Sequence, residues 1–514
     1  MSSLVSQLGN FNPQFLRECR GRLRPRSAAA ALGLSVLFQF LLWTSVTGSA
    51  GDEVTVDDWL DICQSLTWVI PYALFTLGGY YIVDDLTQEA KSGTLNFIRL
   101  SPRPAREILL GKLLGVPILP ALLVAAMIPL HVVSGLLGGL SSLLLGSYYL
   151  IVIAGAITVF TLALLVGLGS GNSSALAKQR AVSAIAFSGL VVFGIAPLFM
   201  SWNTFCIWPS VPTGEVLFRD FDFVLEWMYL PITGNPLFGH IFTLGTLAIA
   251  AALIWRIAVR KFRIPEATLL SKRLSYVIVA YLNILAWGFL QTREMDSYDR
   301  LGGLAGIYAM DVALGFALIF ALVPSRQMLL NWLSYRPSGQ KSGGTQQANW
   351  LDWIWVDVSP SMGAIAINFI IVAALLVPSL LLFIIGSGES ISIPGLIFST
   401  VSLGLSALTY AAIVQLIFSM RLRAPMAWAV GTVAVLAIVP VLVLTFLNVW
   451  NGDSKVIDVL VTFLGVPALI WTESEIPSIA IVGLVGQICF LGFVWTRFNQ
   501  NLKKLVRPVA QDTL

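Results

Sequence analysis

Few side chains of this sequence have the types and spacing that chemistry requires. Asp311 is the only carboxylate well inside an expected membrane span. An ionisable group at such a depth is a functional candidate by default, although an acid paired with neighbouring polar groups explains it equally well. His131 and His240 lack Cys, His or carboxylate neighbours at metal-ligand spacing, and the sequence has no nucleophile constellation. We therefore expect no catalytic, cofactor or metal site, and we retain Asp311 as a candidate for a translocation path.

A second set of residues indicates mechanical coupling. Polar residues from Glu89 onward lie between two apolar stretches, and a Ser-Pro pair and a Gly-Lys pair follow before the chain becomes apolar again. A polar elbow in this place predicts a cytosolic segment that receives force from a soluble partner. The residues that we assign to coupling are Glu89, Gly93, Thr94, Leu95, Arg99, Ser101, Pro102 and Lys112.

The local sequence of this elbow predicts two helices. Asp84 and Asp85 would be unfavourable at a helix C-terminus, where the macrodipole is negative, so we expect the second span to continue as a helix into the cytosol. Gly93 supplies a left-handed C-cap, and Thr94 caps a short helix over 95–100. The apolar side chains of that helix form a docking surface or lie back on the membrane, and the residues alone favour neither. They are Leu95, Phe97, Ile98 and Leu100.

Composition places the chain in a membrane. Hydrophobic residues make up 57% and charged residues 11% of the chain, and its mean hydropathy is +0.83, whereas soluble domains carry about 25% charged residues. Apolar runs of the roughly 20 residues that cross a bilayer recur along the whole length. We predict an all-α polytopic membrane protein with about twelve transmembrane helices. The expected spans are 28–50, 66–83, 108–134, 146–169, 182–200, 237–257, 275–291, 303–324, 361–386, 395–419, 425–448 and 477–496.

The charges orient these spans, because Lys and Arg near span ends are retained in the cytoplasm. With both chain ends inside, all but four of the 31 basic residues fall on the inner side. The four exceptions are Arg219, Arg293, Arg300 and Lys455. The net charge of +4 is therefore a topology signal, and it gives no reason to expect a nucleic-acid partner. Cys63 and Cys206 both fall on the outer side, where a disulfide could form, but two unpaired thiols are favoured.

A weak internal repeat divides the chain into two six-span units with the same orientation, because six spans return the chain to the cytoplasm. The predicted domains are 1–262, with an interfacial helix at 13–26 and an elbow at 84–107, and 263–514, with a flexible inner linker at 325–360. We expect Asn12 to cap the interfacial helix. The second unit is degenerate, because its elbow lacks the E-x-x-x-G-T-L spacing. Each unit also has an extended outer segment before its last span, at 201–236 and 449–476, which we interpret as re-entrant or interfacial helices.

The spacing E-x-x-x-G-T-L, then L-S-P, then I-L-L-G-K resembles membrane (permease) subunits of ABC transporters of the type-2 exporter class. The match is strongest over 84–115, and the six-span plan extends it to each half. The resemblance implies a coupling helix that sits in a groove of a separate ATP-binding cassette ATPase. One fused twelve-span chain would serve two copies of that ATPase, and the setting would be the bacterial inner membrane with cytoplasmic termini.

The chain itself has no GxxxxGK[ST] loop, so any ATP would be bound and hydrolysed by the partner subunits. A largely apolar interior with few charges favours an amphipathic or lipid-like substrate, moved by alternating access, and the resemblance favours export over import.

Two other classes stay open. A proton- or ion-coupled secondary transporter can also consist of two six-span halves, but it should carry several charged residues in its spans and a long linker after span six. A membrane-embedded lipid or sugar transferase would need acids, His and Arg clustered at one interface. Asp296, Asp299 and Arg300 are the only hint of such a cluster.

Overall fold

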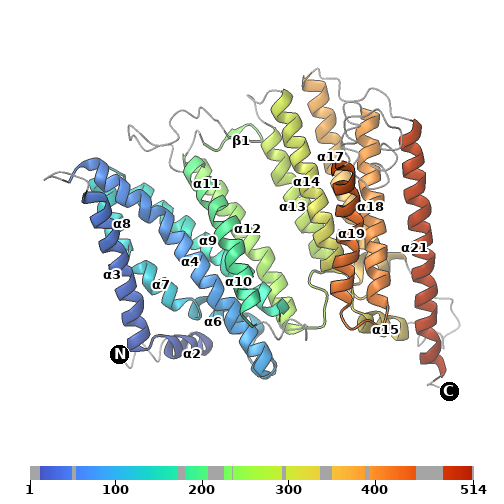
Figure 1. Ribbon diagram of the computed structural model, residues 1–514, viewed down its shortest axis with the longest axis horizontal. Coiled ribbons are helices and arrows are strands. Elements are labelled where there is room, and N and C mark those ends of the chain that lie inside the picture. Colours follow the sequence, from blue (N-terminus) through green and yellow to red (C-terminus); the bar gives the residue numbers. More distant parts are fainter. Residues whose placement is uncertain are drawn as a thin grey trace. The chain divides into compact units, whose positions relative to one another are not determined.

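The chain forms two compact units (Figure 1). The computed structural model describes residues 12–48, 54–170, 180–206, 225–233, 236–291, 297–335, 350–387, 393–446 and 478–511. Unit 1 comprises Met1–Glu226 and Leu230–Pro265, and unit 2 comprises Trp227–Tyr229 and Glu266–Leu514. The regular structure of the described residues is helical apart from one hairpin of β1 (Glu226–Trp227) and β2 (Leu230–Pro231).

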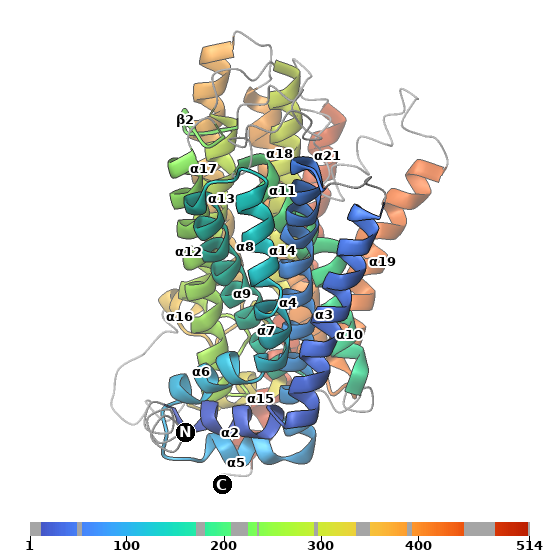
Figure 2. The ribbon, with the colours of Figure 1, turned by 90° about the vertical axis from the view of Figure 1, so that its left-hand side faces the viewer.

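Unit 1 opens with a short helix, α2 (Pro13–Arg22). Asn12 caps it as expected, because its side-chain oxygen accepts hydrogen bonds from two backbone N–H groups of the first turn. Figure 2 shows α2 lying across the direction of the long helices at one end of unit 1. Helix α2 ends at Arg22, so it is shorter than the interfacial helix predicted at 13–26. Pro25 already starts the next helix, α3 (Pro25–Thr47), whose first position suits proline.

The next helix, α4 (Val56–Ser92), is longer than a membrane requires. Its 37 residues correspond to about 55 Å at a rise of 1.5 Å per residue, compared with about 30 Å for a hydrocarbon core. The prediction that this helix continues past Asp85 is confirmed. Gly93 ends it in the expected left-handed conformation, with a φ of 76°. The short helix α5 (Thr94–Arg99) follows directly and lies at the same end of unit 1 as α2 (Figure 2).

The third apolar stretch is not one helix. We expected a continuous span over 108–134, but the chain forms three helices in succession. These are α6 (Ala105–Gly115), α7 (Ile118–Ala125) and α8 (Ile128–Leu137). Pro117 precedes α7 and Pro129 lies in the first turn of α8, and proline interrupts a helix because it removes a backbone donor and clashes with the preceding turn. The apolar length from Ile118 to Leu137 still suffices to cross a membrane.

The rest of unit 1 contains three long apolar segments. The helices are α9 (Ser142–Ser170), α10 (Arg180–Leu190), the π-helical turn η2 (Val191–Ile195), α11 (Ala196–Cys206) and α12 (Pro236–Arg263). The expected outer segment 201–236 falls mostly outside the described residues, and its described part contains the end of α11 and the hairpin. The predicted re-entrant or interfacial helix falls on residues outside that described part.

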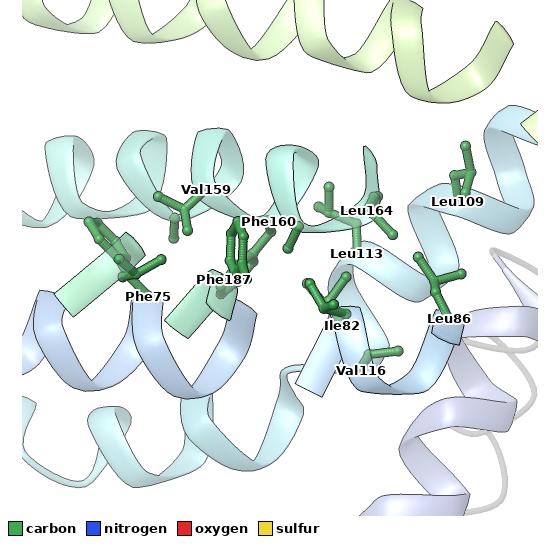
Figure 3. Packing of buried hydrophobic residues seen from close by; sticks show 14 of the residues in the cluster. Phe75, Ile82, Leu86, Leu109, Leu113, Val116, Val159, Phe160, Leu164 and Phe187 are labelled. Carbon is green, nitrogen blue, oxygen red and sulfur yellow. The ribbon is translucent and has the colours of Figure 1, made fainter. Parts of the chain in front are cut away.

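Helix α4 is the centre of the hydrophobic core of unit 1. Its buried side chains meet those of α6, α9 and α10 (Figure 3). The residues labelled there are Phe75, Ile82, Leu86, Leu109, Leu113, Val116, Val159, Phe160, Leu164 and Phe187. A Cβ at Gly78 would lie 2.4 Å from the Phe160 ring, and one at Gly79 would lie 2.5 Å from the Phe187 ring. The two glycines therefore permit α9 and α10 to approach α4 closely.

Unit 2 is a second helical bundle. Its helices are α13 (Lys272–Leu290), α14 (Ser297–Leu322), α15 (Arg326–Tyr335), α16 (Trp350–Trp355), α17 (Met362–Ser387), α18 (Ile393–Ser419), α19 (Pro425–Phe446) and α21 (Ser478–Gln511). The expected flexible linker at 325–360 contains two short helices, α15 and α16, and its residues 336–349 lie outside the described part. The same is true of the second outer segment, 449–476.

Ten helical segments among the described residues are long and apolar enough to cross a membrane. Two more, Met362–Leu376 of α17 and Pro425–Val439 of α19, are apolar over a shorter length. The all-α, multi-pass membrane character is therefore confirmed. The count of twelve spans and the repeat of two six-helix halves stay predictions.

Cysteine labelling will test the orientation of α4. In a chain without its native cysteines, Val56→Cys should react with a membrane-impermeant maleimide in intact cells, because a helix of this length places its two ends on opposite sides. Leu100→Cys, which follows α5 and is highly exposed, should react only after the cells are opened. Labelling of both positions from one side would show that α4 does not cross, and the reverse pattern would place the elbow outside the cytoplasm.

Candidate functional site

A buried lysine joins three helices of unit 1. Lys112 of α6 is fully buried, and its ammonium nitrogen lies 2.6 Å from an Asp85 oxygen, 2.8 Å from a Glu89 oxygen and 3.6 Å from a Glu18 oxygen. Arg22 donates a hydrogen bond to the other Asp85 oxygen and also pairs with Glu18. Glu18 and Arg22 belong to α2, and Asp85 and Glu89 belong to α4. We call these five residues the lysine cluster.

The lysine cluster brings three carboxylates together with two cations, Lys112 and Arg22. Burial disfavours the Lys112 ammonium, but Asp85, Glu89 and Glu18 outweigh this penalty and raise the pKa of Lys112 above its ordinary value. Lys112 therefore stays charged at neutral pH. The three carboxylates place oxygens within 4.8 Å of one another, a geometry that could hold a metal ion. The Lys112 ammonium already serves as their counter-charge, so we assign no metal site to them.

Close backbone approach makes the cluster possible. A Cβ at Gly111 would lie 2.7 Å from the Gln14 Cβ, and one at Gly115 would lie 2.7 Å from the Glu18 Cβ. Glycine at these two positions of α6 therefore lets α2 pack directly against it. The Asn12 side chain also donates a hydrogen bond of 2.7 Å to the Glu107 carbonyl. The Gly-Lys pair was expected to frame a return into the membrane, and in the structure it forms this helix contact.

The corner between α4 and α5 is fixed by the Thr94 hydroxyl. We expected Thr94 to cap α5, but Gly93 takes the cap position and no side chain caps the helix. The Thr94 hydroxyl instead donates a hydrogen bond to the Glu89 carbonyl at 3.3 Å, and its oxygen lies 2.8 Å from the Ser92 hydroxyl oxygen. Because Thr94 begins α5, its side chain reaches back to the last turn of α4. The start of one helix is thereby tied to the end of the other.

Helix α5 has one packed face and one open face. Leu95 and Ile98 are buried in the core of unit 1, so of the four apolar residues of this segment only Phe97 and Leu100 remain for a docking surface or for contact with the membrane. Phe97 and Leu100 keep 79% and 85% of their surface exposed. The alternation arises because residues three apart share a helix face. An exposed aromatic and an exposed leucine therefore project from a helix that is held from behind.

The other predicted elbow residues surround α5. The Arg99 guanidinium lies 5.5 Å from the centre of the Phe262 ring on α12, within cation–π range. The Ser101 backbone N–H donates to the Ile98 carbonyl at 3.1 Å and closes the helix. Pro102 follows in the exposed turn that leads to α6. The structure thus brings all the predicted coupling residues to one end of unit 1.

Glu89, which we assigned to the coupling element, has a buried side chain that pairs with Lys112. It lies three residues after Leu86, which is fully buried, and therefore shares the inward face of α4. Sequence analysis also missed Glu18 and Arg22. Their spacing of four residues on a predicted helix, with opposite charges, was the signal that could have found them.

Unit 2 has a buried lysine of its own. Lys272 begins α13, and its ammonium donates hydrogen bonds to the Ser359 hydroxyl at 2.6 Å, the Trp353 carbonyl at 2.7 Å and the Pro360 carbonyl at 3.0 Å. Asp357 accepts a hydrogen bond of 2.9 Å from the Lys272 backbone N–H. The Ser-Pro pair of the second elbow is therefore held by one lysine through neutral acceptors rather than through three carboxylates.

Asp311 belongs to unit 2, whereas the elbow residues belong to unit 1. It lies on α14 with 7% of its surface exposed, and one of its carboxylate oxygens accepts a hydrogen bond of 3.0 Å from Asn283 of α13. It also lines a cavity of about 440 Å³. Asp311 is therefore paired with a polar neighbour and also faces a cavity, so its surroundings fit both interpretations of this acid.

His131 is buried in unit 1. Its ring nitrogens lie 2.9 Å from the Thr67 hydroxyl and 2.6 Å from the Tyr149 hydroxyl, so both have partners. Such a histidine is a satisfied core residue and carries no site. Cys63 is a buried free thiol, and the Cys206 side chain lies outside the described residues.

Comparisons with known proteins identify no relative of the chain. No family pattern matches it, and neither a curated protein nor a solved structure is similar to it. Its function must therefore be inferred from its own residues.

Removal of Lys112 should strongly destabilise unit 1. Lys112→Met keeps the apolar stem but leaves Asp85, Glu89 and Glu18 with Arg22 as their main counter-charge, and an uncompensated buried charge costs about 3–5 kcal/mol. Thermal unfolding in detergent measures this loss. Adding Glu89→Gln to this variant should restore part of the stability, because it removes one of the unpaired charges.

The matched control is Arg103→Gln, which breaks the half-exposed pair between Arg103 and Glu107 in the same region. Its cost should stay below about 1 kcal/mol. Equal stability of the Lys112 and Arg103 variants would contradict the structural role of the lysine cluster.

Proposed function

We propose that this chain is the membrane permease subunit of an ATP-driven exporter of the ABC type-2 class. The observation that carries the proposal is the open face of α5, where Phe97 and Leu100 project from a helix whose other face is buried. An apolar pair exposed beyond the end of a membrane helix fits a groove on a soluble partner. The elbow sequence from Glu89 to Pro102, which resembles that class, supports the same proposal.

The structure of unit 1 suits the transmission of force. A push on α5 reaches α4 through the Thr94 hydrogen bonds and reaches α2 and α6 through the lysine cluster. A partner that closes on ATP could therefore move several helices as one body. Since the sequence contains no phosphate-binding loop, we assign ATP hydrolysis to separate ATP-binding cassette ATPase subunits, of which two copies would serve one chain.

The remaining parts of the proposal follow from composition and charge. We propose twelve spans in the bacterial inner membrane with both chain ends in the cytoplasm, because this arrangement puts nearly all basic residues inside. Transport would proceed by alternating access of the two units. An amphipathic or lipid-like substrate suits an interior with few charges.

One observation favours a second candidate function. Asp311 is buried beside a cavity within the helices of unit 2, and proton- or ion-coupled transporters commonly use such an acid. Transport into liposomes separates the two functions. If the chain is an ATP-driven permease, a proton gradient alone should drive no uptake of an amphipathic solute into liposomes that contain only the purified chain. Uptake of the solute without any ATPase would establish the proton- or ion-coupled transporter.

Charge on the open face of α5 should release the ATPase. Purification of the wild-type chain in mild detergent should retain a protein that hydrolyses ATP and contains a GxxxxGK[ST] loop. The double variant Phe97→Asp, Leu100→Asp should lose at least about nine-tenths of the retained ATPase activity, because carboxylates cannot enter an apolar groove without a desolvation cost. The membrane level of the variant should be unchanged, since both side chains already face solvent.

The matched control is Ile264→Asp, which adds one charge at another exposed apolar position, 55% accessible, just after α12. It should retain the ATPase. The proposal fails if the wild-type chain retains no ATPase, or if the double variant retains as much as the wild type. The second result would instead support an α5 that lies back on the membrane surface.

A further inference from the structure

Unit 2 contains a partly open cavity of about 440 Å³, within the range of small-molecule sites. Residues from α13, α14, α17, α18 and α19 line it. Most of the lining is aliphatic or aromatic, and the polar contributions come from Asp311, Asn368, Ser406 and the two tyrosines Tyr308 and Tyr410. We propose that this cavity binds an amphipathic organic cation, with a protonated amine on Asp311 and an apolar body against the surrounding side chains.

The polar atoms of the cavity that lack partners are acceptors. One oxygen of Asp311 is buried without a hydrogen-bond partner, and so is the side-chain oxygen of Asn368, whose amide nitrogen donates to Ser275. Asn283, which is not among the lining residues, donates to the first Asp311 oxygen. Buried polar groups normally have partners. A ligand with several N–H donors would supply the missing hydrogen-bond partners of these oxygens.

Charge selects the sign of the ligand. Among the described residues that line the cavity, Asp311 is the only Asp or Glu, and none is Lys, Arg or His. An anionic ligand would meet an uncompensated carboxylate, whereas a cation would neutralise it in a region of low dielectric. The tilted pair Phe316 and Tyr410, with ring centres 5.6 Å apart, adds aromatic faces that attract cations.

The size and the apolar lining favour an organic ligand over a bare inorganic ion. A sodium ion would fill a small fraction of 440 Å³, and beyond Asp311 and Asn368 the side chains of the lining offer it only the hydroxyl oxygens of Ser406, Tyr308 and Tyr410. A hydrated ion would face mostly aliphatic walls. An amine attached to a compact hydrocarbon body satisfies both the acceptors and the walls, because the body displaces water from apolar surface.

This site deepens the proposed function, since it names amphipathic cations as the substrate class, and to that extent it rests on that function. Binding itself needs only the purified chain. A chain that binds the cation but retains no ATPase would refute the proposed function and leave the site intact, and the opposite result would refute the site alone.

The test uses 1-aminoadamantane, a compact hydrocarbon cage with an amine that is charged at neutral pH, and its neutral counterpart 1-adamantanol. Equilibrium dialysis against the full chain in lipid nanodiscs measures saturable binding. The amine should bind at least about tenfold more tightly than the alcohol, because only the amine pairs with Asp311. Asp311→Asn should weaken amine binding at least about tenfold and leave alcohol binding unchanged.

Two further variants keep the test decisive. Gly315→Leu leaves Asp311 in place and extends into open space at the cavity wall, since a Cβ at Gly315 meets no atom within 4 Å. It should abolish binding of both compounds. Glu266→Gln removes an equal charge from an exposed position of unit 2 outside the cavity lining and should bind like the wild type. The proposal is overturned if the wild type binds no amine saturably, if amine and alcohol bind equally, or if Gly315→Leu binds as the wild type does.

Discussion

The buried ammonium of Lys112 is the constraint on which the elbow of unit 1 depends. Three carboxylates from two helices meet there, and without a cation between them they would repel one another in a region with little water. The position of α2 against α4 and α6 is therefore fixed by charge as well as by apolar packing. Because α5 follows α4 directly, the same contacts also fix where the open face of α5 lies.

The sequence predicts those features that depend on neighbouring residues. The Asn12 cap, the left-handed Gly93 and the extension of α4 past Asp85 each follow from residues a few positions apart, and all three are present. Membrane character follows from composition, which needs no contact information at all. These predictions succeed because helix ends and bilayer crossings are governed by local rules.

Features that depend on distant partners could not be predicted from one sequence. Glu89 looks like an exposed acid in a polar elbow, and only the approach of α6 makes it a buried one. The same approach requires glycine at 111 and 115, which in the sequence resemble ordinary members of an apolar stretch. Pro117 and Pro129 could have predicted the interruption of the third apolar stretch, because proline breaks a helix. The apolar length of that stretch instead favours one continuous span.

The two buried lysines suggest how the two units differ in mechanical terms. Lys112 connects three helices through charged contacts, whose strength depends on all partners staying in place, whereas Lys272 holds one loop through neutral acceptors. Displacing the first would separate buried charges and is therefore costly, so a push on α5 should move its helices together. The second fixes a loop whose neighbouring residues lack the coupling sequence. If the proposed function holds, unit 1 receives the greater part of the force, and unit 2, with its cavity at Asp311, contributes the greater part of the recognition.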